Sequence, residues 1–333
     1  ASETTNGDAI AVAPIGAGVD SRALGAAATY GALATRGSGG TGLRQTLDAL
    51  ATASTNLVSA GGAITSNIWA NEADPARVWF AVGTAVYRST DGGATKAAMA
   101  AAPASVSWIM EDPAVENSVF IAAGPHFYVT TDPTVGWTLY YSGPSGATAR
   151  CFVRSRDGLV TWICYTGTFS GSPLQRIEGG VEVTFPGDTS EIRCLALSHD
   201  ASSAGGTIYA VDSHDPPRLF SADALTGLSV VESAETLPSG ATAMHMLCDP
   251  EEDILYIADF DSVASGTGAV RKWVAGADWV GLLRAGDSGQ QAHMLGFVGK
   301  VTQPAELLLP TGPNYAGGSA VGGVLHYKDG IWT

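Results

Sequence analysis

A repeated pattern of short strands runs through most of the chain and limits the folds that it can adopt. An apolar strand is followed by a turn centred on Asp, and then by a second apolar strand with an aromatic residue. In successive copies these aromatic residues are spaced by 40, 42, 47 and 47 residues, at Phe80, Phe120, Trp162, Tyr209 and Tyr256. A period of roughly 40–50 residues that holds about four short strands is typical of a propeller blade.

The number of copies sets the expected size of the propeller. We count six copies, which begin near residues 61, 103, 146, 190, 240 and 287. We therefore predict an all-β fold, a six-bladed β-propeller over residues 61–333, with a seven-bladed propeller as the alternative. The final strand of the sixth copy has only three residues. Because an open ring would leave an unpaired edge, we expect Ala9–Pro14 to pair into the last blade or to supply strands of a seventh.

Residues 1–60 differ from the rest of the chain. They are rich in Ala, Gly and Thr, and Tyr30 is their only aromatic residue. We interpret them as an extended N-terminal arm that cannot build a core alone. Such an arm becomes ordered only by packing on its own propeller or on other subunits. Within this arm, the Gly-rich run 36–42 is typical of a flexible linker, and leucines at near-helical spacing over 43–57 predict a short helix.

One turn of the repeat has a specific pattern. The stretch 89–95 has the form Ser-x-Asp-x-Gly-x-Thr, with these residues at Ser89, Asp91, Gly93 and Thr95, and a decayed copy with Asp132 follows. An Asp side chain accepts hydrogen bonds from backbone N–H groups of its own turn, and Gly adopts backbone angles that other residues resist. The turn resembles the Asp-box of bacterial-neuraminidase-type (BNR) repeats. The resemblance implies an Asp-box β-propeller, in a group that spans sialidases, xyloglucan-cleaving enzymes, sorting receptors, photosystem assembly factors and phage virion proteins.

Charge excludes two classes of partner. The chain has 32 acidic and 17 basic residues, a formal net charge of −15. Such a surface repels phosphate backbones and anionic headgroups, so we expect no nucleic acid and no membrane surface as a partner. No apolar run approaches the roughly 20 residues that cross a bilayer, so we expect no membrane insertion. The polar, acidic residues 1–5 are unlike a signal peptide.

Cysteines and histidines give no defined metal site. The four cysteines, Cys151, Cys164, Cys194 and Cys248, lack C-x-x-C spacing. We interpret them as buried small apolar residues. The alternative is that Cys151 and Cys164 lie on neighbouring strands of one meander and form a bridge.

Other metal candidates are equally weak. His245 and His293 occupy matching places in two copies and would line a central channel, where hydrogen-bonded wall histidines are the plainer interpretation. The acidic runs 249–253 and 259–261 do not follow the spacing of a known calcium loop. We therefore predict neither a metal nor a cofactor.

Three arginines are candidate ligand-binding residues. Arg150, Arg154 and Arg193 fall near the first strands of adjacent copies and would share one face, where guanidinium groups can bind a carboxylate. A sialidase would also need a Tyr–Glu pair, an Asp acid and an Arg-Ile-Pro motif, to which Arg176-Ile177-Glu178 is the nearest match. A xyloglucan-cleaving enzyme would need two Asp in a cleft that usually lies between two propellers, and this chain has one propeller. We therefore predict no catalytic residues and no enzyme.

The expected function follows from the expected arm and rigid loops. An arm without a core and broad propeller loops favour a non-enzymatic structural protein of a virion, such as a phage tail or capsid-associated protein. Its partners would be other protein subunits of an assembly, or a host surface glycan or protein, and its location the virion. The alternative is a secreted or periplasmic propeller that binds glycans or proteins outside the cell, and the second alternative is a glycoside hydrolase. The sequence leaves the ligand and the oligomeric state open.

Overall fold

The structure is a computed structural model. It describes the backbone of the strands named below, and it describes backbone and side chains together for residues 65–69, 77–91, 95–183, 191–198, 201–224, 246, 248, 254–257, 271–274 and 280. Every regular element assigned within this described part is a strand, so the predicted all-β class is confirmed.

In the described part of the chain, the strands form seven antiparallel sheets that follow one another in sequence. The first sheet contains β1 (Val12–Pro14), β2 (Tyr30–Ala34), β3 (Gly42–Gln45) and β4 (Thr55–Ser59). The second contains β5 (Trp69–Ala70), β6 (Val78–Val82), β7 (Ala85–Ser89) and β8 (Ala97–Ala98). The third contains β9 (Val106–Glu111), β10 (Val119–Ala123), β11 (His126–Thr130) and β12 (Thr138–Tyr141).

The remaining four sheets repeat this order. The fourth contains β13 (Ala147–Arg154), β14 (Val160–Gly167), β15 (Leu174–Glu178) and β16 (Val181–Val183). The fifth contains β17 (Ile192–Leu197), β18 (Thr207–Asp212), β19 (Arg218–Asp223) and β20 (Val231–Thr236). The sixth contains β21 (Ala241–Cys248), β22 (Ile254–Asp261), β23 (Ala269–Val274) and β24 (Val280–Arg284). The seventh contains β25 (Gln291–Ala292), β26 (Gly296–Phe297), β27 (Leu307–Gly312), β28 (Gly323–Lys328) and β29 (Ile331–Trp332).

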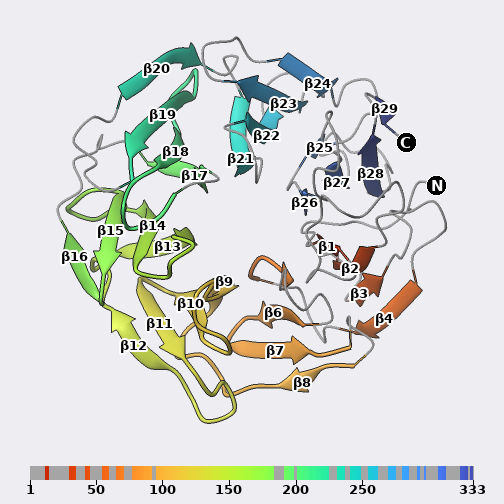
Figure 1. Ribbon diagram of the computed structural model, residues 1–333, viewed down its shortest axis with the longest axis vertical. Coiled ribbons are helices and arrows are strands. Elements are labelled where there is room, and N and C mark those ends of the chain that lie inside the picture. The colour runs from red at the N-terminus through yellow and green to blue at the C-terminus, as the bar shows by residue number, and fades with distance from the viewer. Residues whose placement is uncertain are drawn as a thin grey trace.

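The sheets are arranged as a ring, in chain order, around a common centre (Figure 1). In each sheet the first strand lies nearest the centre and the last strand lies at the rim, as with β17 and β20 (Figure 1). The first sheet, β1–β4, lies in the ring between the last sheet and the sheet β5–β8 (Figure 1). Residues on the first strands therefore come together around the centre, even though they are far apart in sequence.

The second strand of each central sheet is buried on both faces. In β10, Val119, Ile121 and Ala123 pack toward the second sheet. The alternate residues Phe120 and Ala122 pack toward the fourth sheet. This period of two places every side chain of the strand in a core, which is why the strand is a continuous apolar run in the sequence. The repeated aromatic residues all lie on second strands and are at most 4% exposed: Phe80, Phe120, Trp162, Tyr209 and Tyr256.

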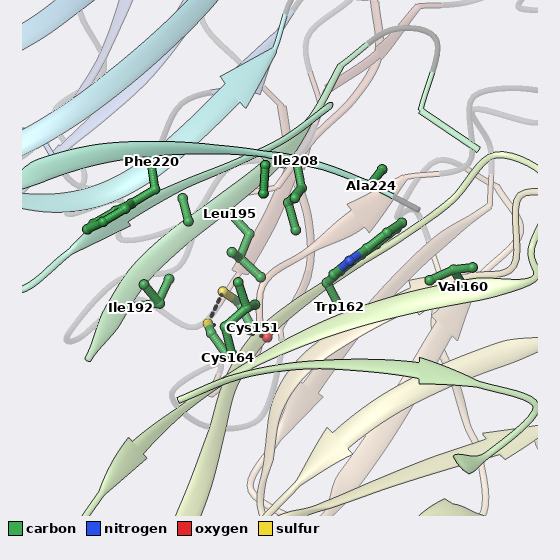
Figure 2. Packing of buried hydrophobic residues seen from close by; sticks show 12 residues of the cluster. Cys151, Val160, Trp162, Cys164, Ile192, Leu195, Ile208, Phe220 and Ala224 are labelled. Carbon is green, nitrogen blue, oxygen red and sulfur yellow. Dashed lines mark hydrogen bonds between the residues drawn. The ribbon is translucent and has the colours of Figure 1, made fainter. Parts of the chain in front are cut away.

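Four apolar clusters join the described sheets in pairs. Each cluster takes its residues from two consecutive sheets, so the core is divided into layers between neighbours instead of forming one central core. The layer between the fourth and fifth sheets contains Trp162, Leu195 and Ile208 (Figure 2). Burying a large apolar side chain stabilises the folded state by about 1.5–3 kcal/mol, so these layers hold the sheets together.

Polar side chains also cross between sheets, about one repeat apart. The Asn67 amide donates to the Ile109 carbonyl oxygen at 2.9 Å, and its own oxygen accepts from the Ile109 N–H at 2.7 Å. Ser107 Oγ donates to the Ala149 carbonyl oxygen at 2.6 Å. These bonds satisfy backbone N–H and carbonyl groups of first strands, which have no neighbouring strand on the side that faces the centre of the ring.

The N-terminal segment differs from the sequence prediction. We expected an extended arm over residues 1–60 with a helix over 43–57, but the backbone there forms the sheet β1–β4, and β3 and β4 occupy the two ends of the predicted helix. Strand β1 pairs with β2, with Val12 opposite Leu33, so part of the expected segment Ala9–Pro14 contributes to this first sheet. Hydrogen bonding between backbones needs no aromatic residue, which is why composition was a poor guide here. Of the predicted linker 36–42, residues 36–41 lie outside the described residues.

Candidate functional site

The first strands carry irregularities at equivalent places. Where a first strand pairs with its second strand, the register shifts by one residue. In β9, β13, β17 and β21 one residue of the first strand is therefore passed over in the pairing. The residues passed over are Ser107, Arg150, Arg193 and Met244. A β-bulge re-aims the side chain of its extra residue and is common next to functional sites. Two of the three predicted arginines therefore occupy bulges on adjacent first strands.

Arg150 and Arg193 converge on one carboxylate. Glu191 Oε1 lies 3.7 Å from Arg150 Nη1 and 3.4 Å from Arg193 Nη1. The three side chains are 26%, 30% and 31% exposed for Arg150, Arg193 and Glu191, so solvent reaches the group. Two guanidinium groups against one carboxylate leave a net positive charge in a chain that is otherwise strongly acidic. We call Arg150, Arg193 and Glu191 the arginine clamp.

The backbone holds Glu191 in place, but its carboxylate is held weakly. The carbonyl oxygen of Glu191 accepts a hydrogen bond of 2.8 Å from the N–H of Ser213, just beyond β18. Half-exposed ion pairs of this kind contribute about 0–1 kcal/mol each. Arg193 Nε is buried and has no hydrogen-bond partner in the described part of the chain. A buried donor without a partner is costly, so the hydrogen bonding of Arg193 is incomplete in this arrangement.

The structure does not bring Arg154 into this group. Arg154 is 7% exposed and lies between the third and fourth sheets. Its Nε and Nη2 donate to Asp112 Oδ2 at 3.1 and 2.8 Å, and its Nη1 donates to Thr161 Oγ1 at 2.7 Å. Its guanidinium carbon lies 4.1 Å from the centre of the Phe120 ring. All three of its nitrogens are engaged, so Arg154 joins two sheets and is not a ligand-binding residue.

The predicted Asp-box turn is held together by its Asp. Asp91 Oδ1 accepts from Ser89 Oγ at 2.8 Å and from the Thr95 N–H at 2.8 Å, and Oδ2 accepts from Thr95 Oγ1 at 2.6 Å. The Thr95 hydroxyl and N–H lower the pKa of Asp91 below its usual value, because these bonds favour the charged form. Gly93 lies outside the described residues. The arrangement is a closed local turn, with its oxygens directed inward to its own backbone.

Asp132 forms a looser turn in the next sheet. Its Oδ1 accepts from the Thr134 N–H at 3.0 Å and from Thr134 Oγ1 at 2.6 Å. These bonds to Thr134 lower the pKa of Asp132 below its usual value.

A third turn of this kind lies at Asp157, one of the Asp-centred turns that the repeat predicts between a first and a second strand. Asp157 Oδ1 accepts from Ser155 Oγ at 2.6 Å and from the Leu159 N–H at 3.2 Å, and Oδ2 accepts from the N–H of Ser203, in the turn between β17 and β18, at 2.7 Å. Burial raises the pKa of Asp157, but the hydrogen bonds from Ser155 and Ser203 outweigh it and lower the pKa to about 2. The spacing Ser155-x-Asp157 repeats that of Ser89-x-Asp91 and was the available signal.

Glu191 is the functional residue that sequence reasoning missed. It precedes the strand that carries Arg193, and only the neighbouring sheet brings Arg150 to it. Within the residues whose side chains are described, no three His, Cys, Asp or Glu side chains are grouped to hold a metal. The side chains of His245, His293, the run 249–253 and the run 259–261 lie outside the described residues. Over the same described part, no helix has the length and apolar character needed to cross a membrane.

Comparison with known proteins defines the fold. No protein-family model matches the chain, and no curated protein sequence matches it. An ancestral GH74 enzyme is similar in structure with a TM-score of 0.68 and 9% identity, over 99% of this chain and 47% of that one. A GH74 enzyme from Niastella koreensis is similar with a TM-score of 0.63 and 13% identity, over 98% of this chain and 54% of that one. The chain therefore spans about half the length of these two enzymes.

A propeller domain matches the chain over its whole length. The β-propeller domain of Cps50 (Swd1) from Myceliophteria thermophila is similar with a TM-score of 0.62 and 12% identity, over 98% of both chains. At these identities the likeness establishes the fold. The chain is a β-propeller, as the repeat predicted.

The expectation of a virion protein is wrong on this evidence. The similar structures named above are two GH74 enzymes and a propeller domain, and nothing in them points to a virus. The expectation depended in part on an arm that would become ordered by packing on its own propeller or on other subunits. The backbone of that segment instead pairs within the chain as β1–β4, so the argument for a neighbouring subunit disappears.

Proposed function

We propose that this chain is a non-enzymatic binding propeller whose arginine clamp binds the carboxylate of an acidic saccharide. The observation that carries the proposal is the convergence of Arg150 and Arg193, from adjacent first strands, on a single carboxylate 3.7 and 3.4 Å away. Arginine pairs bind carboxylates through charge-assisted hydrogen bonds. Glu191 occupies the place that a ligand carboxylate would take.

The net charge of the chain restricts the ligand to one with few negative charges. At −15, the protein repels polyanions over its whole surface, whereas the field of the two arginines acts locally. A ligand with a single carboxylate gains the clamp contacts and suffers little of this repulsion. The GH74 relatives in fold are glycoside hydrolases, which favours a saccharide as the carrier of that carboxylate.

The carboxylates at the end of β9 support binding without catalysis. Glu111 accepts a hydrogen bond of 2.6 Å from Trp79 Nε1 and pairs with Arg77, and Asp112 accepts from Arg154. Both carboxylates are less than 9% exposed. A glycoside hydrolase needs two carboxyl groups that face the sugar. These two are fixed between sheets and cannot transfer a proton to a bound saccharide.

We also propose that the seven sheets are the seven blades of a closed propeller, with β1–β4 as the first blade and the Asp91 turn as an Asp-box. The ring order of Figure 1, in which β1–β4 lies between the sheets β25–β29 and β5–β8, supports this count. Closure without an edge would make the ring a rigid support for the clamp. Contacts with other protein subunits and an extracellular location stay predictions.

Titration with defined probes tests the clamp. Sodium glucuronate should bind the wild-type protein in calorimetry, whereas glucose, which has no carboxylate, should not. Arg150→Gln and Arg193→Gln should each weaken glucuronate binding by about tenfold or more, because a hydrogen bond to a charged group contributes about 1.5–3 kcal/mol. Lys272→Gln, on the third strand of another sheet, removes one positive charge away from the clamp and should leave binding unchanged.

Two further probes separate the carboxylate from its carrier. Acetate tests the carboxylate alone, and a short acidic peptide tests a protein ligand. If glucuronate binds no more tightly than acetate, the sugar ring adds nothing to binding, and the ligand is not specifically a saccharide. Equal glucuronate affinity in wild type and in the two arginine variants would refute the clamp itself.

A further inference from the structure

Two cysteines face each other in the core between the fourth and fifth sheets. Cys151 on β13 and Cys164 on β14 are direct partners in the antiparallel register. Their sulfur atoms lie 2.8 Å apart, and the two side chains point toward one another within the apolar cluster (Figure 2). Both are present as thiols. The arrangement realises the alternative that the sequence left open, in which these two residues meet on neighbouring strands.

The backbone at this pair already suits a disulfide bond. Partner residues on antiparallel strands have Cα atoms about 4.5–5.5 Å apart, which falls within the range of about 4.4–6.8 Å found across disulfides. Closing the bond requires the sulfur atoms to approach by less than about 1 Å from their 2.8 Å separation. No movement of either strand is needed. Geometry is therefore no obstacle to bond formation.

The surroundings distinguish the two thiols. The two sulfur atoms share a hydrogen bond in which either can be the donor, and this bond, with burial, raises the pKa of Cys151 well above its usual value. Burial opposes ionisation of Cys164, but the hydrogen bond with Cys151 and the positive charge of Arg150 outweigh burial and lower the pKa of Cys164. Cys164 is thus the sulfur that ionises first, and the thiolate is the reactive form of cysteine.

The third cysteine nearby is placed differently. Cys194 packs in the next apolar layer, between the fifth and sixth sheets, with Met246 and Leu255. Burial raises the pKa of Cys194 to about 12, so its thiol stays protonated. Cys248 packs against the same layer, but the residue opposite Cys194 in the strand register is Val211. Cys194 therefore serves as an internal control for a buried cysteine with no cysteine opposite it on the neighbouring strand.

We propose that Cys151 and Cys164 form a reversible redox modification site that a small peroxide converts from a dithiol to a disulfide. The Cys164 thiolate attacks one oxygen of hydrogen peroxide, which breaks the O–O bond and gives a sulfenic acid and hydroxide. Cys151 then loses its proton and attacks the Cys164 sulfur, which forms the S–S bond, breaks the S–O bond and expels the sulfenic oxygen as hydroxide. With the protons released, the products are one disulfide and two water molecules, and peroxide is the two-electron oxidant.

Burial selects a small oxidant. The side chains of Cys151 and Cys164 belong to residues 6% and 0% exposed, which hinders a bulky disulfide such as oxidised glutathione. Peroxide is close to water in size and needs only a small opening. Strand β13 also carries Arg150, in the bulge next to Cys151. A disulfide bond at Cys151 would therefore restrain the strand that carries one arginine of the clamp.

Tryptic mapping of the full chain gives a direct test, because each cysteine falls in a different tryptic peptide. Cleavage after arginine releases Cys151 in 151–154, Cys164 in 157–176, Cys194 in 194–218 and Cys248 in 219–271. The folded protein is treated with hydrogen peroxide, blocked with iodoacetamide while unfolding, and digested without reductant. We expect a linked peptide of 151–154 with 157–176, with alkylated Cys194 unchanged. Dithiothreitol should restore both separate peptides, which distinguishes a disulfide from sulfinic acid.

Two cysteine variants and the other possible results of the peptide map complete the test of the proposal. Cys194→Ala should leave the yield of the linked peptide unchanged, whereas Cys164→Ala should abolish it and leave Cys151 free to alkylate. The wild-type map is decisive even if a variant fails to fold. Links that involve Cys194, separate oxidation of Cys151 and Cys164, or four fully alkylated cysteines after peroxide would each overturn the assignment.

Discussion

Arg154 of the fourth sheet donates two hydrogen bonds to Asp112 Oδ2 of the third sheet, at 2.8 and 3.1 Å, with both side chains buried. The two residues are 42 positions apart, one repeat of the fold. Removing one member of a buried pair leaves an uncompensated charge, which costs about 3–5 kcal/mol. The pair therefore joins neighbouring sheets through charge as the apolar layers do through packing.

We predict that Arg154→Met lowers the free energy of unfolding by about 3–5 kcal/mol, because Asp112 is left buried without its partner. Urea denaturation followed by circular dichroism measures the change. The double variant Arg154→Met with Asp112→Leu should recover part of the loss, since no charge remains buried. A double variant less stable than the sum of the two single variants would contradict this account.

Asn67 joins the second and third sheets by a different means. Its amide pairs with both the N–H and the carbonyl of Ile109, and it is 8% exposed. Asn67→Ala would leave two buried backbone groups without partners, and we expect a loss of about 2–4 kcal/mol in unfolding free energy.

A matched variant separates the two bonds of Asn67. Asn67→Asp keeps the acceptor for the Ile109 N–H but sets a carboxylate against the Ile109 carbonyl oxygen. We therefore expect Asn67→Asp to be destabilising at neutral pH and less so in acid, where the carboxyl regains a donor. A loss that does not change with pH would argue against this bidentate contact.

The Asp157 turn should make stability depend on pH in acid. The pKa of Asp157 is about 2 in the folded protein, against an ordinary value of 3.8. Its contribution is present above the unfolded pKa and is lost as the pH falls from about 4 through about 2. Because the carboxylate is near the surface, solvent screening limits the contribution to about 1 kcal/mol. Unfolding of Asp157→Asn should show a smaller decrease in stability over this pH range than unfolding of the wild type.

The sequence predicted the parts of this protein that are local or periodic. The spacing of Phe80, Phe120 and Trp162 indicated buried second strands, and Asp91 accepts hydrogen bonds from its own turn. Contacts between residues one repeat apart could not be predicted from the sequence, because nothing near Arg154 indicates Asp112 as its partner. The same limit explains why Arg150, Arg154 and Arg193 were grouped, although a β-bulge turns only two of them toward Glu191.

Glu191 competes with the proposed ligand, so its neutralisation should strengthen binding. We expect Glu191→Gln to increase the affinity for glucuronate by about three- to tenfold, because two weak ion pairs no longer have to be broken. Calorimetry at fixed ionic strength measures this change. Added salt should weaken glucuronate binding in both proteins, since screening acts on half-exposed charges. Weaker binding by Glu191→Gln would mean that this carboxylate assists the ligand instead of replacing it.

Oxidation of Cys151 and Cys164 should stabilise the fold against denaturant. The bond would close a loop from 151 to 164, and a disulfide across a loop of about 15 residues contributes roughly 3 kcal/mol by restricting the unfolded chain. We therefore expect peroxide-treated protein to unfold at a higher guanidinium concentration than the dithiol form, with the difference removed by dithiothreitol. Cys194→Ala should retain the full difference between the two forms. Cys164→Ala should lose this difference, because Cys151 then has no partner sulfur. Equal denaturation midpoints for the two wild-type forms would contradict the prediction, because the bond would then strain the strands as much as it restricts the unfolded chain.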